Sequence, residues 1–368
     1  MSADSKIEWT HHTFNPWWGC QRVSPGCEHC YAEALSKRFG RAQWGPGVPR
    51  VPTSEKMWKE PLRWNVAARE AGERRRVFCA SMADVFEDLP ELVPLRARLF
   101  ELVAKTPDLD WLLLTKRPEN ADRLWSQAQY DAFNGADSLG PTWAPNVWIG
   151  TTVEDQRRAD ERIPHLLKVP ARVRFLSCEP LLGPVELPQF CRCGCGLTRR
   201  EAVDDAMRGP AALNRDQADA IVARGGSLGV DWVICGGESG SGARPMHIDW
   251  ARSLRDQCAE SAVPFFFKQW GDYSTVYETS ADPGAVALPA RGALSRWLNL
   301  NGGHGFHGER VVAVRSVGKK AAGRSLDGRT HDAFPEATEV EPIYPEPPRD
   351  LSRVAVRTCP ISGLESHR

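Results

Sequence analysis

The sequence predicts an α/β protein built as a partial or complete TIM-like (β/α) barrel, with a helical insertion and a small C-terminal extension. Seven short apolar runs recur along the 368 residues, and several gaps between them are long enough for a helix. A hydrophobic content of 42% supports a sizeable core. The runs are 7–9, 77–80, 111–114, 147–149, 173–176, 232–235 and 264–267.

Two of these gaps carry a clear helical pattern. Apolar residues three or four positions apart follow the second run and precede the last run, and Pro107 stands just beyond the first set. Strands that alternate with helices form parallel βαβ units, as a barrel requires. The two sets are Leu92, Leu95, Leu99 and Leu102, and Ile248, Ala251, Leu254 and Cys258.

The pattern divides the chain into three parts. We expect the barrel in residues 1–275, with insertions at about 40–76 and 189–228, because these intervals are too long for simple crossovers. Residues 276–335 are expected to form the C-terminal extension. Residues 336–368, which include a proline-rich stretch, are expected to form a tail.

Charge and composition narrow the function classes. Lysine plus arginine and aspartate plus glutamate both number 47, so the formal net charge is zero, which argues against a protein that coats nucleic acid by bulk charge. There is no apolar stretch of about 20 residues and no signal-peptide pattern, so we expect a cytoplasmic protein without membrane association. Eleven cysteines are many for a reducing compartment, where clustered thiols more often bind metal.

The strongest local motif is NPWWGCQRVSPGCEHCYAE, in which Cys20, Cys27 and Cys30 form a C-x6-C-x2-C set ahead of a helical pattern at 31–39. Its glycines and proline suit a loop that folds around a bound centre. A cubane cluster has four irons, so three local cysteines leave one iron free for another ligand. The alternative is a closed structural zinc site, in which His11, His12 or His29 completes a Cys3His set.

Polar residues stand where six of the apolar runs end. Active sites of (β/α) barrels lie at the carboxyl ends of their strands, so we expect these side chains to share one mouth. They are Ser81 and Asp84; Thr115, Lys116 and Arg117; Thr151, Thr152 and Glu154; Glu179; Gly236, Gly237 and Glu238; and Lys268 and Gln269.

The cysteine motif resembles the cluster loop of radical SAM enzymes close to spore photoproduct lyase, although its first spacer has six residues rather than three. The wider chain resembles a phage-associated family known as the gene product 37 and gene product 68 family. The matching segments are IEWTHHTFNPWWGC, GCEHCYAE, LLLTKRPEN, FLSCEPLLGP, WVICGGESGSGARPM, FFFKQWG and VGKKAAGRSLDGR.

The resemblance implies a barrel of the radical SAM type with a [4Fe-4S] cluster on the three cysteines and S-adenosylmethionine (SAM) across the strand ends. It implies Ser81 and Asp84 near the SAM amino group, and Thr115 and Lys116 near its carboxylate. The other polar strand ends are expected to contact the cofactor through the adenosine or from the shared mouth; they are Thr151, Glu179, Gly236, Gly237 and Glu238.

The expected activity is reductive cleavage of SAM to a 5′-deoxyadenosyl radical, with an electron donor such as flavodoxin or ferredoxin. The resemblance leaves the substrate open, with nucleic acid as one candidate. Cys178, and less so Cys235, is a candidate hydrogen-atom donor, although cysteines at such positions are more often small core residues. The rival functions are an iron-sulfur or zinc protein that does not use SAM, and a phage-derived, zinc-stapled nucleic-acid-binding or assembly module.

Two further motifs have two interpretations each. Cys191, Cys193 and Cys195 are a candidate second metal site, but their one-residue spacing fits no common zinc or cluster motif. A basic run near the end of the matched region is either a phosphate contact or, as charge runs usually are, a solvated helix face. Its cations are Lys319, Lys320 and Arg324.

Overall fold

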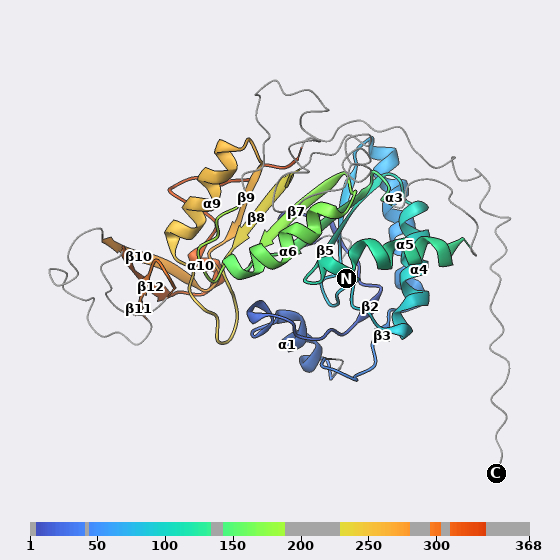
Figure 1. Ribbon diagram of the computed structural model, residues 1–368, viewed down its shortest axis with the longest axis horizontal. Coiled ribbons are helices and arrows are strands. Elements are labelled where there is room, and N and C mark those ends of the chain that lie inside the picture. Colours follow the sequence, from blue (N-terminus) through green and yellow to red (C-terminus); the bar gives the residue numbers. More distant parts are fainter. Residues whose placement is uncertain are drawn as a thin grey trace, which may run out of the picture.

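The computed structural model describes residues 5–40, 44–133, 143–187, 229–279, 295–302 and 310–335. Seven parallel strands form one sheet in the order β1-β4-β5-β6-β7-β8-β9, and this sheet curls into half of a barrel (Figure 1). The partial form of the predicted barrel is therefore confirmed. The strands are β1 His12–Thr13, β4 Arg75–Cys79, β5 Leu109–Thr115, β6 Val147–Thr152, β7 Val173–Cys178, β8 Trp232–Gly236 and β9 Phe265–Gln269.

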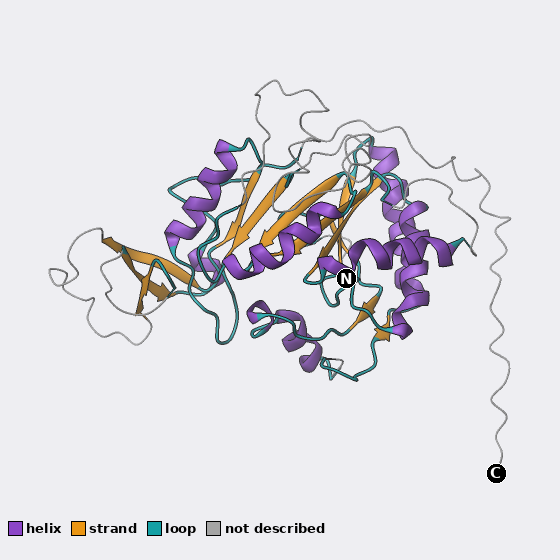
Figure 2. Cartoon of the chain, viewed as in Figure 1, coloured by secondary structure: helices purple, strands orange, loops and turns teal. Residues whose placement is uncertain are grey.

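Helices lie along the outside of this sheet, while α1 lies beyond the strand ends (Figures 1 and 2). Both helices predicted from apolar spacing are present, as α4 and α9. None of the helices in the described ranges has the length and apolar composition needed to cross a lipid bilayer. The helices are α1 Tyr31–Arg38, α2 Glu55–Trp58, α3 Glu60–Ala71, α4 Val93–Ala104, α5 Ala121–Ala132, α6 Gln156–Lys168, α9 Ile248–Glu260 and α10 Lys319–Ala322.

Local sequence explains where several helices begin and end. The Asp155 side chain caps α6 by accepting a hydrogen bond from the Arg158 amide at 2.9 Å. Helix α3 carries Pro61 in its first turn and ends at Gly72, which adopts the left-handed conformation. Helix α3 packs on β4 and β5, so part of the interval 40–76 is the crossover helix that joins β1 to β4.

The sheet buries both of its faces, and alternate residues of each strand face opposite sides. The convex side packs against the helices and forms the larger apolar core. The concave side holds a smaller core rich in aromatic rings, in which Trp232 lies at the centre, with its ring 5.8 Å from Phe175 and 6.3 Å from Trp148. The members of this concave core are Trp9, Phe78, Leu112, Trp148, Val173, Phe175, Trp232, Ile234 and Phe266.

The first predicted strand is wrong in position. The structure places β1 at His12–Thr13, where it pairs with β4, instead of at residues 7–9. Trp9 instead fills the open side of the half-barrel, with its ring 4.8 Å from Phe78 and 6.1 Å from Trp232. An apolar run is buried either as a strand of the sheet or as a segment that covers the sheet. The concave face of a half-barrel is apolar, so it needs such a covering segment.

The C-terminal extension forms a separate antiparallel sheet of three strands in the order β10-β12-β11. From there the chain returns to the half-barrel, where Asp332 bridges to Phe266 and the Phe334 ring lies 5.2 Å from Trp232. The expected insertion 189–228 and the tail 336–368 lie outside the described residues. The remaining strands are β2 Trp17–Trp18, β3 Val51–Pro52, β10 Tyr273–Thr279, β11 Ser295–Asn299 and β12 Val311–Ser316.

Gly150 in β6 tests this packing, because a Cβ atom there would come within 2.3 Å of the Phe175 ring. We expect Gly150→Ala to lower the free energy of unfolding by about 2 kcal/mol, the cost of overpacking a tight core. Gly183→Ala is the matched control, since its Cβ would meet its nearest neighbour at an ordinary 3.5 Å. Urea unfolding measures both, and equal midpoints for the two variants would contradict the packing of the concave core.

Candidate functional site

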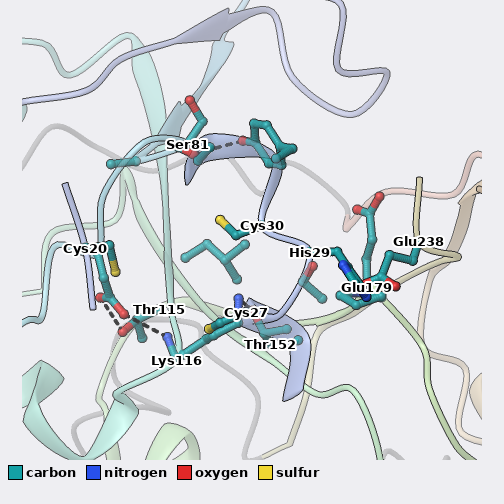
Figure 3. Close-up of a pocket in the computed structure, with 18 of the residues that line it drawn as sticks. Cys20, Cys27, His29, Cys30, Ser81, Thr115, Lys116, Thr152, Glu179 and Glu238 are labelled. Atoms are coloured by element: carbon teal, nitrogen blue, oxygen red, sulfur yellow. Dashed lines mark hydrogen bonds between the residues drawn. The ribbon is translucent and has the colours of Figure 1, made fainter. Parts of the chain in front are cut away.

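A cavity of about 450 Å³ opens at the carboxyl ends of the strands. Cys20, Cys27 and Cys30 all line it, and Figure 3 shows their side chains around the same space. The three cysteines are half-buried and unpaired with one another. The structure therefore brings the three cysteines to one cavity together with polar residues from several strand ends.

The cysteines belong to one loop, residues 19–30, which we call the cysteine loop. It begins where the Gly19 amide donates to the carbonyl of Met82 at 3.1 Å, beside the end of β4. Its only regular structure is a single 3-10 turn at Pro25–Cys27, and it ends where Cys30 precedes α1. Backbone bridges to Ala83 and Trp44 hold the start of the loop at Gly19 and Cys20, and side chains from elsewhere hold the rest.

The first of these side chains is Arg117, just after β5. Its guanidinium donates to Asp84 at 2.8 Å and to the carbonyl of Gln21 at 2.9 Å, and it lies 3.8 Å from the sulfur of Cys20. Asp84 also accepts from the hydroxyl of Thr115 at 2.7 Å. Arg117 thus ties the first cysteine to the loops that follow β4 and β5.

The second is Glu154, just after β6, which is fully buried. Its carboxylate accepts from Arg162 at 2.7 Å, from the Gly26 amide at 3.3 Å and from the hydroxyl of Ser24. A Cβ atom on Gly26 would come within 2.8 Å of this carboxylate, so the loop approaches it as closely as glycine permits. Glu154 thus holds the middle of the cysteine loop.

The third is Arg244, which pairs with Glu238 at the end of β8 at 2.6 Å. The same guanidinium donates to the carbonyl of Pro25 and to Glu28, both at 2.9 Å. We call Arg117–Asp84, Arg162–Glu154 and Arg244–Glu238 the three arginine pairs. The carboxylate of each pair follows a different strand, and together the pairs fix the cysteine loop over the cavity.

These pairs change the roles expected for two residues. Asp84 and Glu238 line the cavity as predicted, but the oxygens of both carboxylates already accept hydrogen bonds from arginines and backbone amides. A carboxylate whose lone pairs are used in this way positions the loop, and has little capacity left for a ligand. Asp84 and Glu238 are therefore positioning residues of the loop, and we do not propose a direct contact of either with SAM.

Other predicted residues face the cavity with capacity to bind. Lys116 donates to Thr152 at 3.2 Å, and its ammonium has no carboxylate partner in the described part of the chain. Glu179 accepts from both Lys268, at 2.7 Å, and Gln269, at 2.8 Å. Ser81, Thr115 and Gly237 also line the cavity.

Three predicted residues lie behind the cavity lining rather than in it. Thr151 is buried and donates to the carbonyl of Thr115 at 3.0 Å. Gly236 lies against the Glu179 side chain, and a Cβ atom added at Gly236 would lie 3.3 Å from the carboxyl carbon of Glu179. Cys178 is fully buried in the larger, convex core.

Strand alternation explains the position of Cys178. In β7, Phe175 faces the concave side and Ser177 lines the cavity, so Cys178 faces the helices. Cys235 takes the same orientation in β8. Burial raises the pKa of both thiols, as expected for small core residues. Both thiols are therefore core groups outside the cavity lining, and we do not propose either as a hydrogen-atom donor.

Neighbouring groups shift the pKa of the Cys20 thiol in opposite directions. Burial and the nearby Asp84 carboxylate raise the pKa of its thiol to about 12, while the Arg117 guanidinium lowers it. Among the described residues, no group of three or more histidine, cysteine, aspartate or glutamate side chains has the arrangement needed to hold a metal ion.

Of the three histidines considered for a zinc site, only His29 reaches the cavity. Its ring packs against the backbone of Gly242, where a Cβ would lie 2.7 Å from it. His11 accepts from the Arg76 amide at 2.8 Å, and His12 stacks on Trp64 at 4.4 Å. The cysteines 191, 193 and 195 lie outside the described residues.

Residues 4–335 match the family model described as "Protein of unknown function (DUF5131)". The chain belongs to the DUF5131 family. No curated protein and no solved structure matches it significantly. The cavity, the cysteine loop and the three arginine pairs all lie within the part of the chain that the DUF5131 model covers.

Sequence reasoning missed two residues of this DUF5131 site, Arg162 and Arg244. Arg162 lies inside α6, where it looks like any charged helix residue, and Arg244 follows the glycine-rich turn after β8. No local pattern marks either one. Arg162 acts on the loop only through Glu154, and Arg244 bonds to Pro25, which is 219 positions away in the sequence.

The loop attachment can be tested in metal-free protein. Arg244→Ala removes charged hydrogen bonds worth about 1.5–3 kcal/mol each, so we expect Cys27 to react with a maleimide at least about tenfold faster. Arg244→Lys keeps the positive charge but loses the forked guanidinium, so we expect its Cys27 reaction rate to lie between those of the wild type and Arg244→Ala. Arg157→Ala is the control, since this exposed arginine of α6 pairs with Glu161 away from the loop. Mass spectrometry follows the rate, and a wild-type rate in Arg244→Ala would show that this pair does not hold the loop.

Proposed function

We propose that the protein is a radical SAM-type enzyme, with a [4Fe-4S] cluster on Cys20, Cys27 and Cys30 and SAM in the adjoining cavity. The observation that carries this proposal is the number and placement of the thiols. Three cysteines of one loop line the cavity, and within the described ranges no fourth cysteine does so. A cubane held in this way keeps one iron for an external ligand, whereas an electron carrier with four cysteines does not.

The cavity also fits SAM chemically, because it offers polar groups on an apolar floor. Lys116 presents an ammonium without a carboxylate partner in the described chain, which suits the SAM carboxylate. Trp9, Phe78 and Leu114 present apolar surface for the adenine and methionine carbons. Ser81 also lines the cavity, where its hydroxyl can accept from the amino group or the ribose hydroxyls.

When bound, the cluster and SAM supply one-electron cleavage of SAM to a 5′-deoxyadenosyl radical, after reduction by a donor such as flavodoxin or ferredoxin. The tasks of the chain are to hold the cysteine loop rigid, to orient SAM through Lys116, and to keep water from the reactive space. The three arginine pairs serve the first task. The concave aromatic core, which closes the cavity floor with Trp9, serves the last.

The iron content tests the metal assignment. We expect Cys20→Ala, Cys27→Ala and Cys30→Ala, each purified without oxygen, to lose most of their iron and sulfide, since each change removes one of three thiolates. Cys258→Ala is the control, because this thiol is buried in α9 outside the cavity lining. Zinc in place of iron would support the zinc-stapled module, and wild-type iron in all three variants would remove the assignment.

SAM binding and turnover test the activity. We expect Lys116→Gln to weaken SAM affinity by about tenfold to a hundredfold while iron content is unchanged, because it removes one charge-assisted hydrogen bond. Lys105→Gln is the control, as this exposed lysine pairs with Glu101 on the surface. Calorimetry measures the affinity of both variants.

In the wild-type protein, the dithionite-reduced cluster should give an electron paramagnetic resonance signal that shifts with SAM. The reduced protein should also form 5′-deoxyadenosine slowly without substrate. A signal that ignores SAM, with no 5′-deoxyadenosine formed, would overturn the proposal and leave an electron-transfer or structural cluster.

A further inference from the structure

Two adjacent lysines beside the cavity have no counter-charge among the residues that the structure describes. Lys319 lines the cavity and Lys320 follows it, and both are exposed. They open α10, a four-residue helix set between Gly318 and Gly323, which lies between the two sheets in Figure 1. Neither lysine has a carboxylate within ion-pair distance among the residues that the structure describes. The positive charge at this point is therefore free for a ligand.

The position of α10 is fixed by the strand ends. The carbonyl of Asp272 accepts from the amides of Val317 and Gly318 at 2.9 and 3.0 Å, and the Asp272 amide donates to the carbonyl of Glu238 at 2.9 Å. Gly271 permits this contact, since a Cβ there would come within 2.0 Å of the same carbonyl. The two lysines are thus carried on backbone that is bonded to the end of β8, beside the cysteine loop.

Arg324, the third cation of this basic run, has a different role. It pairs with Asp332, and its guanidinium lies 5.1 Å from the centre of the Phe266 ring. These contacts fasten the returning chain to β9. The run therefore divides into one structural arginine and two lysines that face outward at the cavity mouth.

The other cations of the cavity already have partners or a role. Lys268 is neutralised by Glu179 at 2.7 Å, and Arg117 is paired with Asp84. Lys116 lies on the β5 side, where we place the SAM carboxylate. Lys319 is carried by α10, so the two lysines of the cavity lining that lack a carboxylate partner in the described ranges come from different elements.

We propose that Lys319 and Lys320 bind a phosphate group of the substrate. This inference rests on the proposed function for the place of the substrate, because SAM beside the cysteines leaves the mouth of the cavity for the second reactant. Two uncompensated positive charges on consecutive residues favour a multiply charged anion over a single carboxylate, and lysine binds phosphate as a point charge. A local patch of this kind is compatible with the zero net charge of the whole chain.

Binding of phosphate-bearing probes tests this inference without turnover. Fluorescence anisotropy with the full chain, purified without oxygen and without SAM, would compare a labelled nucleoside monophosphate with a labelled single-stranded DNA ten-mer and RNA ten-mer. We expect Lys319→Gln/Lys320→Gln to weaken the binding of the preferred probe by about tenfold, and to reduce the salt dependence of binding, because two phosphate contacts are lost. The double variant Lys56→Gln/Lys59→Gln is the matched control, since it removes the same charge from an exposed surface outside the cavity lining.

The outcomes separate the sources of the phosphate. Tighter binding of a ten-mer, lost in the Lys319→Gln/Lys320→Gln variant and kept in the control, assigns a polynucleotide, and equal binding of the mononucleotide assigns a nucleotide. Wild-type affinity of the variant for every probe, or an equal loss in the control, would overturn the inference. A failure of the proposed function is seen in a different measurement, in which reduced wild-type protein forms no 5′-deoxyadenosine from SAM. Failure of the phosphate site and failure of the proposed function are therefore distinguishable.

Discussion

The attachment of the cysteine loop through buried charge is the constraint on which the site depends. The loop has one 3-10 turn of its own, and beyond the backbone bridges at its start it is held by Arg117, Glu154 and Arg244, which follow β5, β6 and β8. The pair of Arg162 and Glu154 is 7% and 0% exposed. A buried ion that loses its partner costs several kcal/mol, and this penalty opposes any movement that separates a pair. A loop held in this way keeps its three thiols in one place before any cofactor arrives.

The half-barrel explains why the site has both a closed floor and an open mouth. A complete barrel fills its interior with side chains from all of its strands. A half-barrel has no strands on the opposite side, so other segments of the chain must cover its concave face. Trp9 from the N-terminal side and Phe334 from the C-terminal side cover that face with aromatic rings. The carboxyl ends of the strands remain free for the cysteine loop, which is the part that a cofactor can approach.

The cations around the cavity show how a chain with no net charge can still present local positive charge. Arg117 and Lys268 are neutralised by carboxylates from neighbouring strand ends, and they serve the architecture. Lys116 and Lys319 line the same cavity and lack such partners in the described ranges. Formal charge summed over the whole sequence hides this difference, because binding depends on local uncompensated charge.

The sequence by itself determined six of the seven strands of the half-barrel and the helices α4 and α9, because apolar runs and helical spacing reflect burial directly. It also determined the common position of the three cysteines and the polar strand ends, because parallel strands bring their carboxyl ends to one edge. Only the tertiary structure decided that Cys178 faces the helices, since a sheet buried on both faces gives continuous apolar runs that do not reveal which side is which. It also decided that Asp84 and Glu238 serve the loop rather than a ligand. Their arginine partners are bonded to loop residues up to 219 positions away, and no local pattern records a contact at that separation.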